Sequence, residues 1–193
     1  MNIETRAALL KEAEFLVRTR GYSAFSYADL AQRVQIAKAS VHHHFPKKED
    51  LITALVSEYV AVFVLTLEAV ARDNATAADR LTAYAKLFLD GLEKGMLPLC
   101  GALSAERAAL PESLRSSVRD FFQIHLDWLS RVVEEGVAAG DLCPDAAPRE
   151  AALTLLSALE GGSLVGWALD RNADVLSAFT AALRSLKRGA QLP

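Results

Sequence analysis

A run of basic residues and histidines, from Leu30 to Lys48, is the part of this sequence best suited to chemistry with another molecule. Its cationic residues are Arg33, Lys38, Lys47 and Lys48, and three consecutive histidines occupy positions 42–44. The run contains no acidic residue, although the whole chain has a formal net charge of −3. Because lysine and arginine neutralise backbone phosphates, this pattern indicates a surface that binds duplex DNA.

A helix that reads DNA must bring its first residues close to the base edges in the major groove. The helix expected over residues 38–44 begins with Lys38, Ala39 and Ser40, whose side chains are small or can donate to bases and phosphates. We therefore expect this helix to be the recognition helix.

Two further positions next to this helix are candidates for phosphate contacts. Lys47 and Lys48 begin another expected helix, where free backbone N–H groups and the helix dipole favour an anion. The hydroxyl of Tyr27 can reach DNA, or its ring can pack against Phe45; the sequence leaves both open.

The three histidines also raise the question of a metal site. Successive helical residues point about 100° apart, so His42, His43 and His44 diverge. Helical metal ligands usually lie three or four residues apart, so we expect neither a metal nor a cofactor here. At least one of the three is expected to face DNA, and any one of them can instead be solvated without contact.

Along the chain, apolar residues recur at helical spacing, and strand patterns are nearly absent. This pattern predicts an all-α protein of about nine helices. Ser26, with Asp29 three residues later, fits a capping box that begins the second helix. Gly21 fits the end of the first helix. The expected helices span residues 3–20, 27–34, 38–44, 47–72, 77–93, 100–109, 111–139, 149–169 and 174–188.

Charge is distributed unevenly between the two parts of the chain. Residues 1–50 hold eight Lys/Arg and six Asp/Glu, whereas the remainder holds 13 basic and 18 acidic residues. A mildly basic head on an acidic body favours an oriented approach to phosphate. Two cysteines make no disulfide framework, and the start of the chain has no signal-peptide pattern, which is typical of a cytoplasmic protein. Glu58 and Glu68 interrupt the most apolar helix, so no membrane span is expected.

The segment Phe25–Leu51, with SVHHHFPKKEDL at its end, resembles the signature of the TetR family of transcriptional regulators. The resemblance implies a helix-turn-helix DNA-binding domain at 1–48 and a ligand-binding and dimerisation domain at 49–193. It implies a homodimer that represses genes at a palindromic operator until a small-molecule effector binds. The DNA-facing set that we expect is Tyr27, Lys38, Ala39, Ser40, His42, His43, Lys47 and Lys48.

Three positions depart from the pattern of that family. Gln35 stands where many members have glycine, which requires a left-handed backbone or a shifted turn. His42 stands where a phosphate-contacting tyrosine is common, and Lys47 replaces a more usual N-cap residue.

The last two helices carry wide apolar stripes and are the expected dimer interface. Two recognition helices about one DNA turn apart (~34 Å) would then read a palindrome. Gly161 and Gly162 in mid-helix suggest a close helix approach. The interface residues that we expect are Leu156, Leu159, Leu164, Phe179 and Leu183.

An effector pocket is expected among apolar and aromatic residues of the C-terminal part, although such residues more often form a core. Cys100 lies near the start of a short helix, where its thiolate would be stabilised, so it is a candidate sensor of electrophiles; a buried inert thiol is the alternative. The expected ligand-binding residues are Phe88, Leu92, Met96, Cys100, Leu103, Phe121, His125, Trp128 and Trp167.

Two other classes of protein are alternatives to a DNA-binding regulator. An enzyme is disfavoured because the sequence holds no nucleophile elbow, P-loop, dinucleotide fingerprint or paired ligand motif, so no catalytic residues are predicted. A helical module that binds a small molecule or a partner without contacting DNA is the alternative, and the basic helix pair argues against it.

Overall fold

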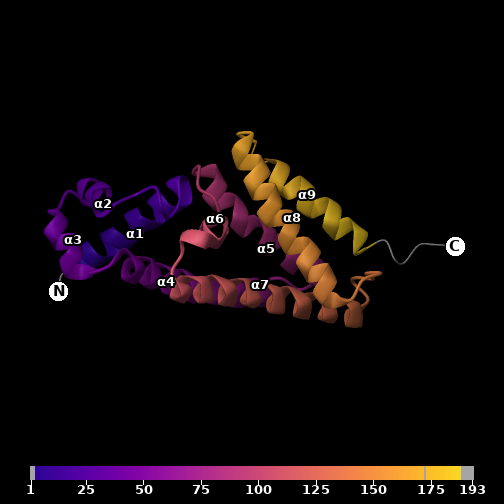
Figure 1. Ribbon diagram of the computed structural model, residues 1–193. Helices are drawn as coiled ribbons and strands as arrows, with labels where there is room; N and C mark the ends of the chain where they lie inside the picture. Colours follow the sequence, from indigo (N-terminus) through magenta and orange to yellow (C-terminus); the bar gives the residue numbers. More distant parts are fainter. Residues whose placement is uncertain (1–2, 172, 188–193) are drawn as a thin grey trace. The chain divides into compact units, whose positions relative to one another are not determined.

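The computed structural model describes residues 3–171 and 173–187, and within them the chain forms nine α-helices and no strand (Figure 1). The prediction of an all-α protein of about nine helices is confirmed; only the predicted end of the last helix, at Arg188, lies outside the described residues. The helices are α1 (Ile3–Arg20), α2 (Tyr27–Val34), α3 (Lys38–His44), α4 (Lys48–Asp73), α5 (Ala77–Glu93), α6 (Leu99–Ala105), α7 (Glu112–Ala139), α8 (Pro148–Ala168) and α9 (Ala173–Ser185), with a short 3₁₀ helix, η1 (Arg107–Ala109), after α6.

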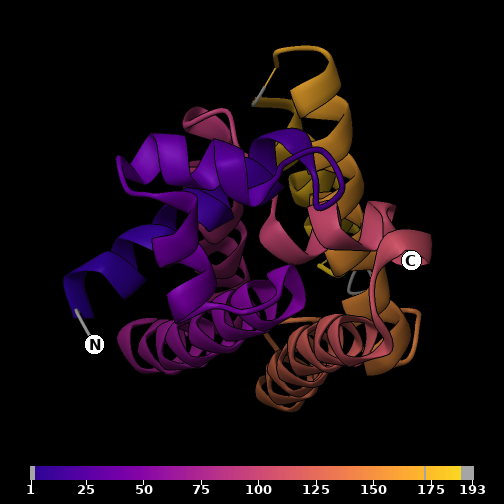
Figure 2. The ribbon, with the colours of Figure 1, turned by 60° about the vertical axis from the view of Figure 1, so that its left-hand side comes forward.

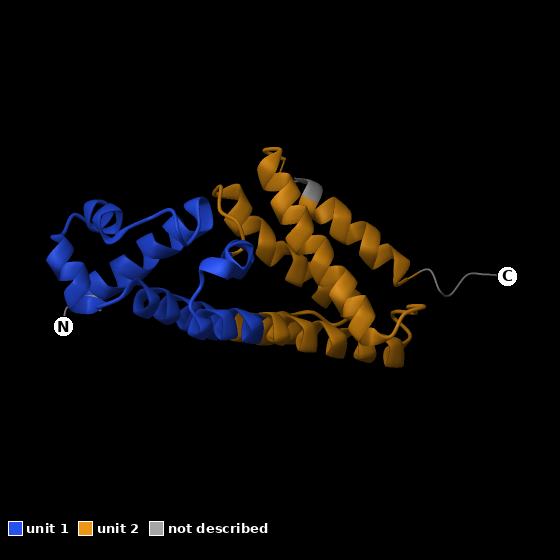
Figure 3. Cartoon of the chain, in the orientation of Figure 1, with its two compact units in different colours: residues 1–62, 99–121 blue, residues 63–98, 122–193 orange. Residues whose placement is uncertain are grey.

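The chain divides into two compact units, drawn in different colours in Figure 3. Unit 1 contains residues 1–62 and 99–121, and unit 2 contains residues 63–98 and 122–193. This division differs from the expected boundary after residue 48, because α6 and parts of α4 and α7 are packed with the N-terminal helices.

In unit 1, local sequence signals set the ends of the first helices (Figure 2). Gly21 follows α1 with a φ of +93°, a left-handed conformation that glycine adopts without strain. Ser26 caps α2: its backbone N–H donates to Asp29 Oδ2 at 2.7 Å, and its Oγ accepts from the N–H of Asp29. The predicted capping box is therefore present.

The turn between α2 and α3 contains a non-glycine residue in a left-handed conformation. Gln35 has φ 58° and ψ 43°, so of the two alternatives left open by its replacement of glycine, the left-handed backbone is the one observed. Hydrogen bonds from the N–H of Gln35 to Gln32 and from that of Ile36 to Ala31 hold the turn. A left-handed conformation costs roughly 1–2 kcal/mol in a residue with a Cβ, so the turn carries local strain.

We expect Gln35→Gly to raise the free energy of unfolding by up to about 1 kcal/mol, because glycine adopts this backbone conformation without a Cβ clash. Thermal melting measures the effect. The matched control is Gln32→Gly on exposed α2, which should destabilise by roughly 1 kcal/mol. A melting temperature that falls equally in both variants would contradict the assignment of strain to Gln35.

In unit 2, α8 and α9 lie side by side and form the most extensive helix pair (Figure 1). Two glycines allow this approach: a Cβ at Gly162 would lie 3.1 Å from Val175 Cα, and one at Gly166 would lie 2.9 Å from the carbonyl oxygen of Arg171. Gly161, by contrast, faces open space. The expected close approach is therefore made at Gly162 and Gly166 and not at Gly161.

The close α8–α9 pair changes the expected dimer interface. Four of the five predicted residues are at most 7% exposed within a single chain and belong to the core of unit 2. These are Leu156, Leu159, Phe179 and Leu183. Only Leu164, at 55% exposure, remains available to a second copy. The apolar stripes of α8 and α9 could pack against a second copy or within the chain. In this structure they pack within the chain, against each other and against α5.

By length and composition alone, α4 and α8 are each apolar enough to cross a membrane. Glu58 and Glu68 were expected to rule out a membrane span in α4, but the helix is still long and apolar enough for one. Core helices of soluble proteins pass the same test, so this is weak evidence of a membrane span.

Candidate nucleic-acid interface

The expected recognition helix, α3, presents exposed side chains at one end of unit 1. Lys38, Ala39 and His43 are exposed on the helix, and Ser40 is partly buried. Val41 is fully buried and anchors α3 to the rest of the unit. The helix therefore has one face fixed in the core and another open to a large partner.

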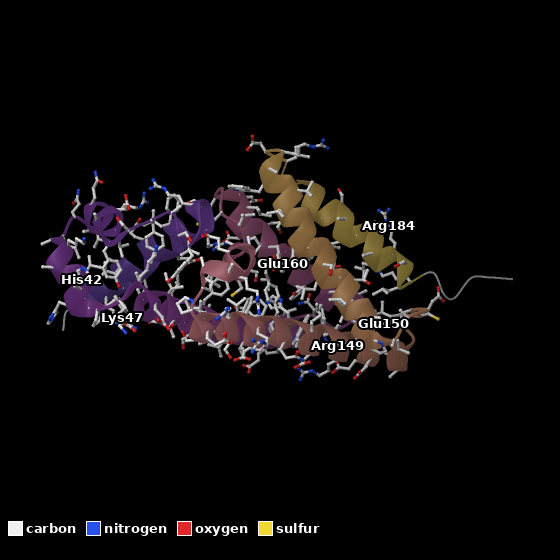
Figure 4. All side chains as sticks on the ribbon, viewed as in Figure 1. His42, Lys47, Arg149, Glu150, Glu160 and Arg184 are labelled. Carbon is white, nitrogen blue, oxygen red and sulfur yellow. The ribbon has the colours of Figure 1, made fainter. Side chains whose placement is uncertain are left out.

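Of the three histidines, His42 and His43 are exposed and His44 is partly buried. His42 Nδ1 lies 3.3 Å from the carbonyl oxygen of Pro46, and its ring packs edge-on against Tyr27 at 4.8 Å. His42 and Lys47 lie at the same end of unit 1 (Figure 4). Among the described residues, no three His, Cys, Asp or Glu side chains gather as a metal ion would need.

The hydroxyl of Tyr27 forms a hydrogen bond within unit 1. The side chain is 7% exposed, and its O–H donates to the carbonyl oxygen of Phe45 at 2.9 Å. Burial, with a smaller effect from Asp50, raises the pKa of Tyr27 to about 12. The packing alternative is therefore the one observed, and Tyr27 ties α2 to the end of α3.

Lys48 is also engaged within the protein, where its side chain is partly buried. Its ammonium donates to the backbone carbonyl oxygens of Tyr22 and Phe25 and lies 3.9 Å from the centroid of the Phe25 ring. Burial lowers the pKa of Lys48, although Glu106 and Asp29 oppose that effect. Lys48 therefore holds the turn between α1 and α2, and its contact with phosphate stays a prediction.

The start of α4 also offers less to an anion than its position predicted. Asp50 Oδ2 accepts from the backbone N–H of Lys47 at 3.0 Å, and Glu49 adds a second acid to the first turn. These carboxylates already complement the helix dipole. The exposed side chain of Lys47 is the part of this segment that remains suited to a phosphate.

Arg33 has partners of its own as well. Its guanidinium forms an ion pair with Glu12 and lies 4.4 Å above the ring of Phe15, both on α1. The cationic run is therefore divided: Arg33 and Lys48 hold α2 and α4 to the rest of unit 1, whereas Lys38 and Lys47 are exposed.

Several of the expected effector residues meet in an aromatic cluster within unit 2. Phe88, Leu92, His125 and Trp128 are all buried, and Tyr84 joins them. The Tyr84 hydroxyl shares a hydrogen bond with His125 Nδ1, and its ring stacks on Trp128 at 5.3 Å. Burial lowers the pKa of His125 to about 3, so the imidazole is neutral at physiological pH. The sequence analysis missed Tyr84, although it lies on one α5 face with Leu81 and Phe88.

Of the remaining expected effector residues, two belong to unit 2 and three to unit 1. Trp167 is 41% exposed on α8, which corrects its placement in a pocket, and Met96 lies partly buried in the connection after α5. Cys100, Leu103 and Phe121 belong to unit 1, where all three are buried.

Glu160 is a partly buried acid that was not among the predicted site residues. It lies on α8 between Leu156 and Ser163, both buried, and Figure 4 marks its place. Its Oε1 is inaccessible to solvent and has no hydrogen-bond partner among residues 3–171 and 173–187. Burial raises the pKa of this carboxyl to about 7. A buried acid on an apolar helix has no distinct sequence signal, because surface helices place glutamate at the same spacing.

We expect stability to fall as the pH rises through about 7, because the raised pKa of Glu160 makes its ionised form costly in the folded state. This contribution is fully present below the ordinary pKa of 4.5 and is lost above pH 7, by about 3 kcal/mol. Glu160→Gln should reduce the difference between melting temperatures at pH 5.5 and 8.5. Glu134→Gln, at an exposed site on α7, is the control; equal pH profiles for all three proteins would contradict the assignment.

The helical fold and the exposed end of α3 define a helix-turn-helix DNA-binding protein. Comparison with known families agrees: residues 9–55 match the model of bacterial regulatory proteins of the tetR family, and residues 77–183 match a tetracyclin repressor-like C-terminal domain. The chain belongs to the TetR family. It is a transcriptional regulator and not an enzyme.

Individual relatives support the same assignment. A TetR-family regulator from Agrobacterium tumefaciens is 30% identical, with a TM-score of 0.91, over 95% of this chain and 98% of that chain. A TetR regulator from Legionella pneumophila is 26% identical, with a TM-score of 0.87, over 97% and 100%. The transcriptional regulator AcuR of Cereibacter sphaeroides is 27% identical over 83% of this chain and 75% of its own length.

Proposed function

We propose that this protein is a cytoplasmic homodimeric repressor that binds a palindromic operator and is released from it by a small-molecule or electrophilic effector. The observation that carries the proposal is the exposed end of α3. There Lys38 and Lys47 supply positive charge, while the small side chain of Ala39 lets the backbone approach the bases.

A dimer is supported by apolar surface on α8. Leu153, Leu164 and Val165 are each more than half exposed, and Trp167 is 41% exposed. Large apolar side chains gathered on one helix are typical of a protein interface. A second copy packed on this helix would cover them and supply a second recognition helix.

The DNA-reading role predicts a specific effect of Lys38→Ala. Loss of one phosphate or base contact should weaken operator binding about tenfold, with the melting temperature unchanged because the side chain is exposed. If the lost contact is to phosphate, the dependence of affinity on salt should fall by about one ion. A fluorescence titration at several salt concentrations measures both.

Lys86→Ala provides the control, because it removes an exposed charge from α5 in unit 2. Its affinity for the operator should match that of the wild type. If Lys38→Ala also binds like the wild type, α3 does not dock as proposed.

Release by an electrophilic effector can be tested at Cys100, which lies on α6 and is 1% exposed. We expect acrolein to release the wild type from DNA as the Cys100 thiolate adds to its terminal alkene carbon, with a proton completing the adduct. Reaction should be slow, since α6 must open to admit the reagent.

The chain contains its own control for this experiment, because Cys143 is exposed. Cys100→Ser should abolish release by acrolein, and Cys143→Ser should leave it intact. Unchanged release from Cys100→Ser would remove Cys100 as the sensor and leave only non-covalent effectors.

A further inference from the structure

The end of α6 reaches back to the N-terminal helices through a single carboxylate. Glu106 stands between α6 and η1, and its Oε2 accepts from the backbone N–H of Ser23 at 2.9 Å. The two residues are 83 positions apart in the sequence and both belong to unit 1. Ser23 lies in the turn that joins α1 to α2.

This contact depends on the absence of a side chain at Gly21. A Cβ at that position would lie only 2.1 Å from Glu106 Oε1, far closer than atoms can approach. Gly21 therefore serves two purposes: it provides the left-handed end of α1, and it leaves space for the carboxylate.

The turn is held between opposite charges. Glu106 accepts hydrogen bonds on the N–H side of Tyr22 and Ser23, whereas the ammonium of Lys48 donates to the carbonyls of Tyr22 and Phe25. The negative carboxylate thus faces the positive N–H ends of the peptide groups, and the positive ammonium faces their negative carbonyl ends. Both arrangements are electrostatically favourable.

Glu106 remains charged in this setting. Burial opposes its ionisation, but hydrogen bonds from Ser23 and Tyr22, together with the charge of Lys48, lower its pKa. The contact is therefore present across the physiological pH range and does not act as a pH switch.

The turn leads directly into the DNA-reading helices. Ser26, which caps α2, follows Phe25, and Tyr27 joins α2 to the end of α3. At the other end, Leu99 and Leu103 of α6 are fully buried, and α6 packs against α1. A displacement of α6 would therefore pull on the turn from which α2 and α3 start.

We propose that Glu106 is a positioning residue for DNA reading: it couples the position of α6 to the orientation of α2 and α3 without touching DNA. The inference rests on the proposed DNA-binding function and adds the route by which a change at α6 alters operator affinity.

The test compares Glu106→Ala, which removes both the charge and the acceptor for the Ser23 N–H, with the wild type on a duplex from the region upstream of the gene. Removing a negative charge should by itself tighten binding to a polyanion, so a loss of affinity can only come from lost positioning. We expect affinity to fall about tenfold with the salt dependence unchanged, and amide hydrogen exchange in residues 22–25 to accelerate.

Glu112→Ala is the matched control, since it removes an exposed carboxylate of unit 1 that forms ion pairs with Arg115 and Arg119. It should bind DNA as tightly as the wild type, or slightly more tightly. If Glu106→Ala behaves like this control in affinity, the positioning role is overturned, whether or not hydrogen exchange changes. If the wild type itself does not bind the duplex, the proposed function fails first, and the two failures are thereby distinguished.

Discussion

The structure of unit 1 depends on one partly buried cation. Lys48 begins α4, yet its ammonium lies under the carbonyls of the α1–α2 turn and beside the Phe25 ring. An ammonium loses hydration on burial, and that cost is offset here by two carbonyl oxygens, two aromatic faces and the nearby charge of Glu106. Through this single group the start of α4, the end of α1 and the start of α2 are fixed together, and α3 inherits its place from them.

Unit 2 is organised by a different constraint, which is the close approach of α8 and α9 at Gly162 and Gly166. This approach uses up the apolar stripes that face each other and leaves another face of α8, with Leu153 and Leu164, exposed. Two buried polar groups accompany this core: the neutral His125, joined to Tyr84, and the carboxyl of Glu160. Buried groups of this kind are costly for stability and are commonly retained where they bind a ligand or tune a conformational change.

Much of this arrangement could be predicted from local sequence signals. The Ser26–Asp29 capping box, the helix end at Gly21 and the left-handed Gln35 each depend on residues within a few positions, so the sequence predicts them well. The exposed cations Lys38 and Lys47 were also placed correctly on the surface, although their contacts with DNA stay a prediction.

What could not be predicted is the direction of side chains with two available partners. Lys48 and Tyr27 could face either DNA or backbone carbonyls, and the choice depends on a turn brought close by tertiary packing. Leu156 and Phe179 could face a second copy or their own core, and Trp167 could be inside or outside. The contact of Glu106 with Ser23 could not be predicted because the two residues lie far apart in the sequence.

We propose that α3 is presented to DNA by the turn between α1 and α2 and that two copies read one operator. A footprint of the protein on the DNA upstream of its gene tests this most directly. We expect two symmetry-related protected half-sites whose centres are separated by a whole number of DNA turns. Protection should occur at protein concentrations that leave unrelated DNA unprotected. Protection no stronger than that of unrelated DNA, or a single half-site without a symmetry mate, would contradict it.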